Sequence, residues 1–257
     1  MEENIFLLSI PNFIPSYKED TCYGYSKYKE NLLDLLKETS GGYCMYCYNR
    51  VYINGDYMCQ IEHGIEKSNS TRLEDCVPNL GIACPKCNQS YKKTGEKKRK
   101  LKKESITAFE KGTCLTFNCK VQCNNFIALR KEYVKYANII LQPFGVVNDE
   151  TKHEYRLQYD VLKGKYLPSE EETYTSNERR FIEAHIKQFG LNNPKRRNRE
   201  IGRYCRNVID QNSILDEVEY NNLLVDLFRD KLRKKDINTA VHICEVVYKH
   251  ALINLQT

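Results

Sequence analysis

The sequence contains no tryptophan and no apolar run long enough to cross a bilayer. Its most apolar stretch, around residues 139–144, is far shorter than the roughly 20 residues that a membrane-spanning helix needs. The first three residues, Met1-Glu2-Glu3, include two acids, and no apolar segment with small residues follows them. We therefore expect neither a membrane anchor nor a signal peptide, and we expect a cytoplasmic protein.

The composition also excludes global disorder. Hydrophobic residues make up 41% of the 257 positions, which is enough for a core in one large domain or two small ones. The twelve cysteines would suggest disulfides in a small secreted protein, but this chain is long, rich in lysine and without an export signal. Reduced thiols and a metal site fit this composition better.

Positive charge is concentrated in one short segment. The net charge is +6, and residues 91–103 carry eight basic residues and one acid, so the rest of the chain sums to −1. Such a segment is typical of a surface that binds a polyanion, although a solvated helix face is the alternative. The candidate nucleic-acid contacts are Lys92, Lys93, Lys97, Lys98, Arg99 and Lys100.

The pattern predicts an α+β fold that is mostly helical. We expect a helix over residues 16–39 capped by Ser16, a hairpin turn at Asn54-Gly55 and a strand within residues 155–161. Further helices are expected from Ser176 and Pro194 and over residues 213–234 and 237–254. The predicted organisation is an N-terminal helical segment, a central core, a mixed connecting region and a C-terminal helical region, at residues 1–40, 41–110, 111–175 and 176–257.

Two Cys-x-x-Cys pairs stand out in the central region. Cys44 and Cys47 form the first pair, and Cys84 and Cys87 form the second, with 36 residues between Cys47 and Cys84. Each pair lets two thiolates from one tight turn bind the same ion, and two pairs together complete a tetrahedral zinc site. A site with four cysteine ligands has no open position for a substrate. We therefore predict a structural Zn²⁺ here and expect the reactive groups to be residues other than these cysteines.

Candidate reactive groups lie between and directly after the cysteine pairs. The carboxylate of Glu62 and the amide oxygen of Asn88 are suitable ligands for a hard divalent cation. His63 can take a proton from water near neutral pH. A lone Glu-His pair is more often a surface feature, but its position between the cysteine pairs favours a functional site.

These residues carry a resemblance. The segments CMYC, QIEHGIEKS and NLGIACPKCNQSYKKTG resemble the zinc-containing HNH nucleases, which have a ββα-metal fold. The resemblance implies that Glu62 and Asn88 bind Mg²⁺ or Mn²⁺ and that His63 activates the attacking water. It also implies that Asn79 braces the loop and orients His63, so the expected catalytic residues are Glu62, His63, Asn79 and Asn88.

The resemblance extends, more loosely, over residues 40–210. Over this range the chain is similar to the HNH subunits of Septu-type and retron-associated bacterial defence systems. This similarity implies a DNA-cleaving effector with a separate ATPase partner. This chain departs from that pattern at Gly64-Ile65-Glu66, where Pro or Arg is frequent. An RNA-cleaving HNH enzyme and a non-catalytic zinc-stabilised adaptor that binds nucleic acid are the alternatives.

Two further features stay open at the level of sequence. Cys114, Cys119 and Cys123 suggest a second metal site without an obvious fourth ligand, for which His153 or Cys22 are candidates; plain thiols are the favoured interpretation. A second basic cluster is either a solvated surface or a set of phosphate contacts, and it comprises Lys195, Arg196, Arg197, Arg199, Arg203 and Arg206.

Overall fold

The computed structural model describes residues 4–193, 199–215 and 218–256. It shows an α+β chain in which helices dominate, as predicted. The α-helices are α1 Lys29–Ser40, α2 Lys103–Lys111, α3 Asn124–Ala137, α4 Ser176–Gln188, α5 Glu200–Gln211, α6 Leu223–Leu232 and α7 Ile237–Gln256. The strands are β1 Leu7–Ser9, β2 Tyr52–Ile53, β3 Asp56–Tyr57, β4 Gln60–His63, β5 Leu80–Ala83, β6 Leu157–Asp160 and β7 Lys165–Pro168.

The central region contains two antiparallel strand pairs. β2 and β3 form the predicted hairpin, in which Asn54 and Gly55 adopt φ values of 52° and 91°, as a tight hairpin turn requires. β4 pairs with β5, and His63 lies opposite Leu80. A loop and two short 3₁₀ turns separate these two strands. A π-helix, Lys86–Lys92, follows β5 and begins within the second cysteine pair, so that it contains Cys87.

A three-stranded sheet links the N-terminus to the middle of the chain. β6 pairs with β1 on one side and with β7 on the other, both antiparallel. β6 lies within the predicted strand over residues 155–161, whereas β1 was not predicted from the sequence. A strand of three residues is too short to show a clear periodicity in the sequence. The partner of β1 also lies about 150 residues away in the chain.

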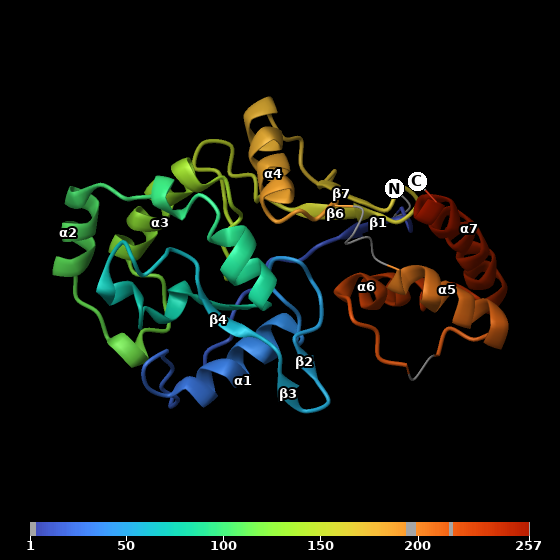
Figure 1. Ribbon diagram of the computed structural model, residues 1–257, viewed down its shortest axis with the longest axis horizontal. Coiled ribbons are helices and arrows are strands. Elements are labelled where there is room, and N and C mark those ends of the chain that lie inside the picture. The colour runs from blue at the N-terminus through green and yellow to red at the C-terminus, as the bar shows by residue number, and fades with distance from the viewer. Residues whose placement is uncertain (1–3, 194–198, 216–217, 257) are drawn as a thin grey trace.

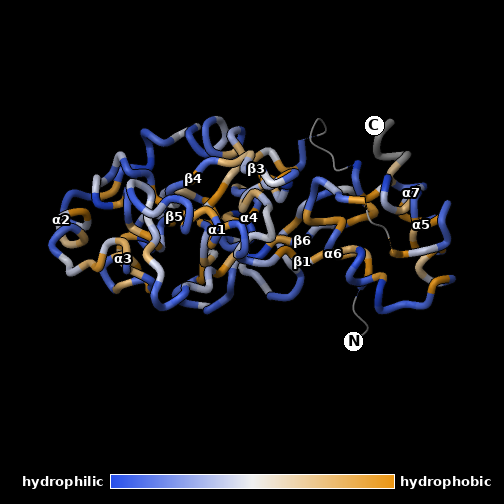
Figure 2. The backbone as a smooth tube through the Cα atoms, turned by 90° about the horizontal axis from the view of Figure 1, so that it is seen from below, coloured by the Kyte–Doolittle hydropathy of each residue, from blue (hydrophilic) through white to orange (hydrophobic). Residues whose placement is uncertain are grey.

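The elements gather into three neighbouring parts in Figure 1. One part holds α1, α2, α3 and the β4–β5 pair; α4 and the three-stranded sheet lie in the middle; α5, α6 and α7 form the other end. Figure 2 shows the elongated shape, with apolar stretches at β1, β6 and α6 between the two ends. No described helix is long and apolar enough to cross a membrane.

Several predicted helices begin elsewhere than expected. Residues 16–28 are not helical, because their backbone N–H groups have tertiary partners: those of Tyr25 and Ser26 each donate to Asp75 Oδ1 at 2.8 Å. α3 was not predicted, and α4 is capped by Thr175 rather than by Ser176. The expected helix start at Pro194 lies outside the described residues, and so do Lys195, Arg196 and Arg197 of the second basic cluster.

Candidate metal centre and catalytic pocket

The four cysteines of the two Cys-x-x-Cys pairs come together as predicted. The Sγ atoms of Cys44, Cys47, Cys84 and Cys87 all lie within 4.8 Å of one another, and those of Cys47 and Cys84 are 3.7 Å apart. A tetrahedral zinc ion with Zn–S bonds of about 2.3 Å requires sulfur–sulfur edges of about 3.8 Å. The geometry therefore fits a metal ion such as zinc.

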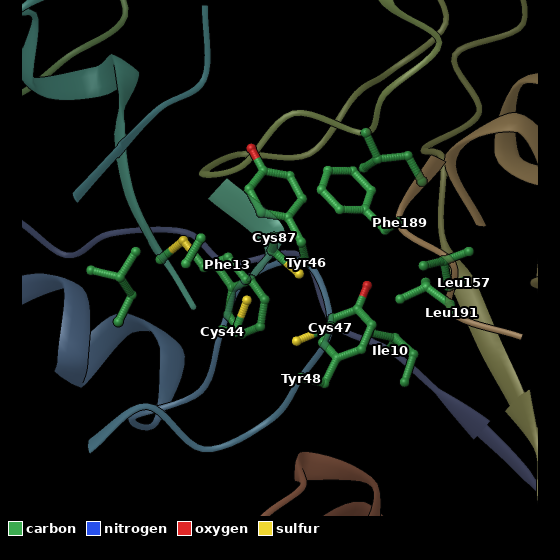
Figure 3. Packing of buried hydrophobic residues seen from close by; sticks show 14 of the residues in the cluster. Ile10, Phe13, Cys44, Tyr46, Cys47, Tyr48, Cys87, Leu157, Phe189 and Leu191 are labelled. Atoms are coloured by element: carbon green, nitrogen blue, oxygen red, sulfur yellow. The ribbon is translucent and has the colours of Figure 1, made fainter. Parts of the chain in front are cut away.

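Backbone donors and apolar side chains surround this cysteine site. The Cys84 N–H donates to Cys44 Sγ at 3.3 Å, and the Cys87 N–H donates to Cys84 Sγ at 3.4 Å. In Figure 3, Tyr46 and Phe189 lie beside the sulfurs, and their rings stack at 4.5 Å. N–H groups directed at sulfur stabilise thiolates, and a shell of buried side chains suits a closed structural site.

Glu62 is a buried acid that has a buried cation as its partner. Its side chain on β4 is only 1% exposed, and its Oε1 forms an ion pair with the ammonium of Lys92. Its other oxygen, Oε2, accepts a hydrogen bond from the Tyr46 hydroxyl at 3.2 Å. Burial raises the pKa of Glu62, and Lys92 opposes this shift by stabilising the carboxylate.

His63 is held in one orientation by a backbone carbonyl. Its Nε2 lies 3.1 Å from the carbonyl oxygen of Glu74, and its ring meets the edge of Tyr25 at 5.1 Å. Because a carbonyl oxygen can only accept, Nε2 carries the proton and Nδ1 carries the lone pair. Burial lowers the pKa of His63 to about 4, so the imidazole is neutral at pH 7.

Asn79 ties the loop after His63 to the start of β5. Its Oδ1 accepts the Ile65 N–H at 2.7 Å, and its Nδ2 donates to the carbonyl oxygens of Ile65 at 2.9 Å and Leu73 at 3.3 Å. The Gly64 N–H donates to the Asn79 carbonyl oxygen at 2.7 Å. Asn79 is fully buried, so it acts behind the pocket on the shape of this loop, not at its surface.

Three of the four expected catalytic residues share one pocket. Glu62 and His63 from β4 and Asn88 from the π-helix line a cavity of about 340 Å³. Asn88 donates from Nδ2 to Gln60 Oε1 at 3.1 Å, which leaves its amide oxygen as the atom that could bind a cation. Antiparallel pairing and the turn through the second cysteine pair thus bring together groups from two separate parts of the chain.

Two of the six expected nucleic-acid contacts are buried, so the prediction of surface contacts was wrong for them. Lys92 is 3% exposed and Arg99 is 4% exposed. Lys92 also donates to the His63 carbonyl oxygen, while Arg99 binds Glu66 Oε1 through Nε at 3.0 Å and Nη2 at 2.8 Å. Each cation is paired with a carboxylate of the pocket. The remaining four contacts are exposed: Lys93, Lys97, Lys98 and Lys100.

Glu66 is a pocket residue that the sequence reasoning missed. Its Oε1 accepts from Arg99 and from the Tyr133 hydroxyl, the latter at 2.6 Å. Its Oε2 is buried without a hydrogen-bond partner. The available signal was the departure of Gly64-Ile65-Glu66 from the pattern of the resembling family, which placed an acid four residues after Glu62.

No protein-family model matches this chain, and neither the curated proteins nor the solved structures contain a match.

Proposed function

We propose that this chain is a metal-dependent endonuclease of the HNH type, which hydrolyses phosphodiester bonds in nucleic acid, with DNA as the favoured substrate. The observation that carries the proposal is the shared pocket of Glu62, His63 and Asn88, next to a four-cysteine site. An acid, a neutral imidazole and an amide in one pocket are the groups that one-metal phosphodiester hydrolysis requires.

The donor atoms of the pocket fit a hard divalent cation. Glu62 and Asn88 offer oxygen atoms, and the buried, unpartnered Oε2 of Glu66 adds a third. Mg²⁺ and Mn²⁺ prefer such ligands. Because the Lys92 ammonium lies against Glu62, this position already stabilises positive charge, and Lys92 must move aside when a cation binds Glu62. A bound ion would polarise the scissile phosphate and neutralise the leaving 3′ oxygen.

The other groups position and deprotonate water. His63 is neutral at pH 7, so its Nδ1 lone pair can take a proton from a water molecule without first losing one. The hydrogen bond of Nε2 to the Glu74 carbonyl keeps that tautomer and orients the ring. Asn79 maintains the loop that carries this carbonyl through its bond to Leu73, the residue before Glu74.

The exposed lysines beside the pocket are the proposed phosphate contacts. Lys93 lines the pocket itself, and Lys97, Lys98 and Lys100 lie on the surface that follows the π-helix. Contacts of this kind position a nucleic-acid backbone and carry no sequence information. In line with the family resemblance, we further propose a role as the effector of a cytoplasmic antiphage complex with a separate ATPase subunit.

Plasmid cleavage in Mg²⁺ or Mn²⁺ tests the proposal, with the chain alone and with any ATPase that co-purifies. His63→Ala should abolish cleavage without changing zinc content, while His242→Ala, at an exposed position of α7, should leave both unchanged. Cleavage by His63→Ala at the wild-type rate would refute the mechanism. An RNA substrate assayed in parallel distinguishes the RNA-cleaving alternative.

A non-catalytic adaptor is the second candidate, and the Glu62–Lys92 ion pair is the observation in its favour. A carboxylate that is permanently neutralised by an ammonium would not bind a metal ion. The adaptor would bind nucleic acid with the same affinity in EDTA and in Mg²⁺ and would never cleave it. Cleavage that depends on a divalent ion and on His63 excludes this candidate.

A further inference from the structure

A second group of cysteines gathers outside the pocket and the first cysteine site. Cys76 precedes the 3₁₀ turn Val77–Asn79, and Cys119 follows the 3₁₀ turn Thr116–Asn118. These two turns pack against each other. Cys123 precedes α3, and Cys114 lies on the segment that joins α2 to the second turn. The fold thus brings a cysteine from the β4–β5 loop to three cysteines that are close in sequence.

The four thiols of this group are electrostatic neighbours. Burial raises the pKa of Cys76, and nearby Cys119, Cys114 and Cys123 each raise it further. Burial likewise raises the pKa of Cys119, and Cys114 and Cys123 add to that shift. Cys76 and Cys119 are 4% and 6% exposed, and the other two are partly exposed.

Cys76 is a candidate for the fourth ligand that was not obvious from the sequence. The two earlier candidates have other partners, because His153 Nδ1 lies 3.2 Å from Glu178 Oε2 and the Cys22 thiol donates to Asn118 Oδ1 at 3.0 Å. The Thr116 N–H donates to Cys114 Sγ at 3.3 Å, the same kind of contact that the Cys84 N–H makes with Cys44 in the first site.

The segment between α2 and α3 has little regular structure and few buried apolar side chains of its own. Over residues 112–123 it contains one 3₁₀ turn as its only helix or strand, and its two aliphatic side chains, Leu115 and Val121, point into solvent. A segment without a core of its own is the usual setting of a structural zinc ion. In Figure 1 this segment passes beside the N-terminal chain, where the Tyr23 N–H donates to the Phe117 carbonyl at 2.9 Å.

We propose that Cys76, Cys114, Cys119 and Cys123 bind a second structural Zn²⁺ ion. Among the described residues only the first site has its ligand atoms within 4.8 Å of one another, so the second set is more open and an ion would draw its loop-borne thiols together. Asn79 lies three residues after Cys76, so the ion would fix the loop on which Asn79 binds Ile65 and the Glu74 carbonyl binds His63. The proposal does not depend on nuclease activity.

Metal analysis of the full-length chain, purified under reducing conditions, tests this proposal. Wild-type protein should contain two zinc ions per chain. Cys114→Ser and Cys123→Ser change partly exposed thiols and should lower the content to one, while Cys59→Ser, outside both sets, should leave it at two. The zinc ion that remains in Cys114→Ser and in Cys123→Ser should be the one at the first site. Adding Cys84→Ser to Cys123→Ser should therefore remove it and leave no zinc.

A thiol assay gives an independent measurement on the same protein. Chelation of zinc from the native protein should make the metal-bound cysteines accessible to a thiol reagent. If both sites hold zinc, eight of the twelve cysteines should become newly reactive, and if only the first site does, four should. One zinc per chain in wild type, unchanged by Cys123→Ser, would overturn the proposal. So would a disulfide between any two of the four cysteines in freshly reduced, zinc-supplemented protein.

Discussion

The buried ion pair of Glu62 and Lys92 makes the most direct test of the pocket. Replacing Lys92 by methionine keeps the length of the side chain and removes its charge. The Glu62 carboxylate, 1% exposed, would then retain the Tyr46 hydroxyl as its remaining donor. Removing one partner of a buried pair costs about 3–5 kcal/mol, because the other charge is left without a counter-charge. We expect Lys92→Met to lower the free energy of unfolding by about that amount at pH 7.

The dependence of the Lys92→Met stability on pH and on Mg²⁺ shows whether the lost stability comes from the unpaired Glu62 carboxylate. Without Lys92 the pKa of Glu62 rises further above its unfolded value, so the destabilisation is largest at neutral pH. The destabilisation should shrink as the pH falls through the unfolded pKa of about 4.3, because below that pH the carboxyl is protonated in both states. Mg²⁺ should stabilise Lys92→Met more than wild type, because the ion no longer competes with an ammonium.

Urea unfolding at pH 7 and pH 5, with and without Mg²⁺, measures these effects. Glu62→Gln combined with Lys92→Met is the matched control, because it removes both charges. It should recover much of the lost stability and should no longer respond to Mg²⁺. A loss below about 1 kcal/mol would contradict the buried pair. An identical Mg²⁺ effect in wild type and Lys92→Met would contradict Glu62 as a ligand of the proposed ion.

Three other predictions concern the zinc site, acid stability and the basic surface. Cys84→Ser should lose the first zinc ion and, with it, folding free energy on the order of 10 kcal/mol, seen as loss of cooperative unfolding; a stable variant without that zinc ion would contradict this. His185 is buried, accepts the Ile140 N–H at 3.1 Å, and burial lowers its pKa to about 3, so the fold keeps it neutral. Stability should therefore fall as the pH drops below the unfolded value of about 6.5, by about 2 kcal/mol at pH 5, and His185→Gln should flatten that slope in denaturant titrations. Lys97→Ala with Lys98→Ala should weaken binding to all sequences alike and reduce the slope of log K against log salt by about 2; unchanged binding would remove these lysines from the interface.

Local patterns in the sequence determined a large share of the candidate site. A Cys-x-x-Cys pair specifies its own turn, and two such pairs predict a four-sulfur site, which the structure contains. Asn54-Gly55 predicts a hairpin turn because both residues tolerate positive φ. The turn of each cysteine pair and the hairpin turn depend on residues within a few positions of one another, so their geometry follows from covalent structure and backbone preference.

Tertiary structure decided the partners of the buried charges and thiols. Lys92 and Arg99 look like surface residues within a basic run, yet the fold turns them inward to pair with Glu62, which is buried, and with Glu66, which is 12% exposed. Cys76 joins three cysteines from a distant segment only because two short turns pack together. Periodicity and spacing do not report such contacts, since a charge or thiol has the same local signature whether its partner is water or a residue brought to it by the fold.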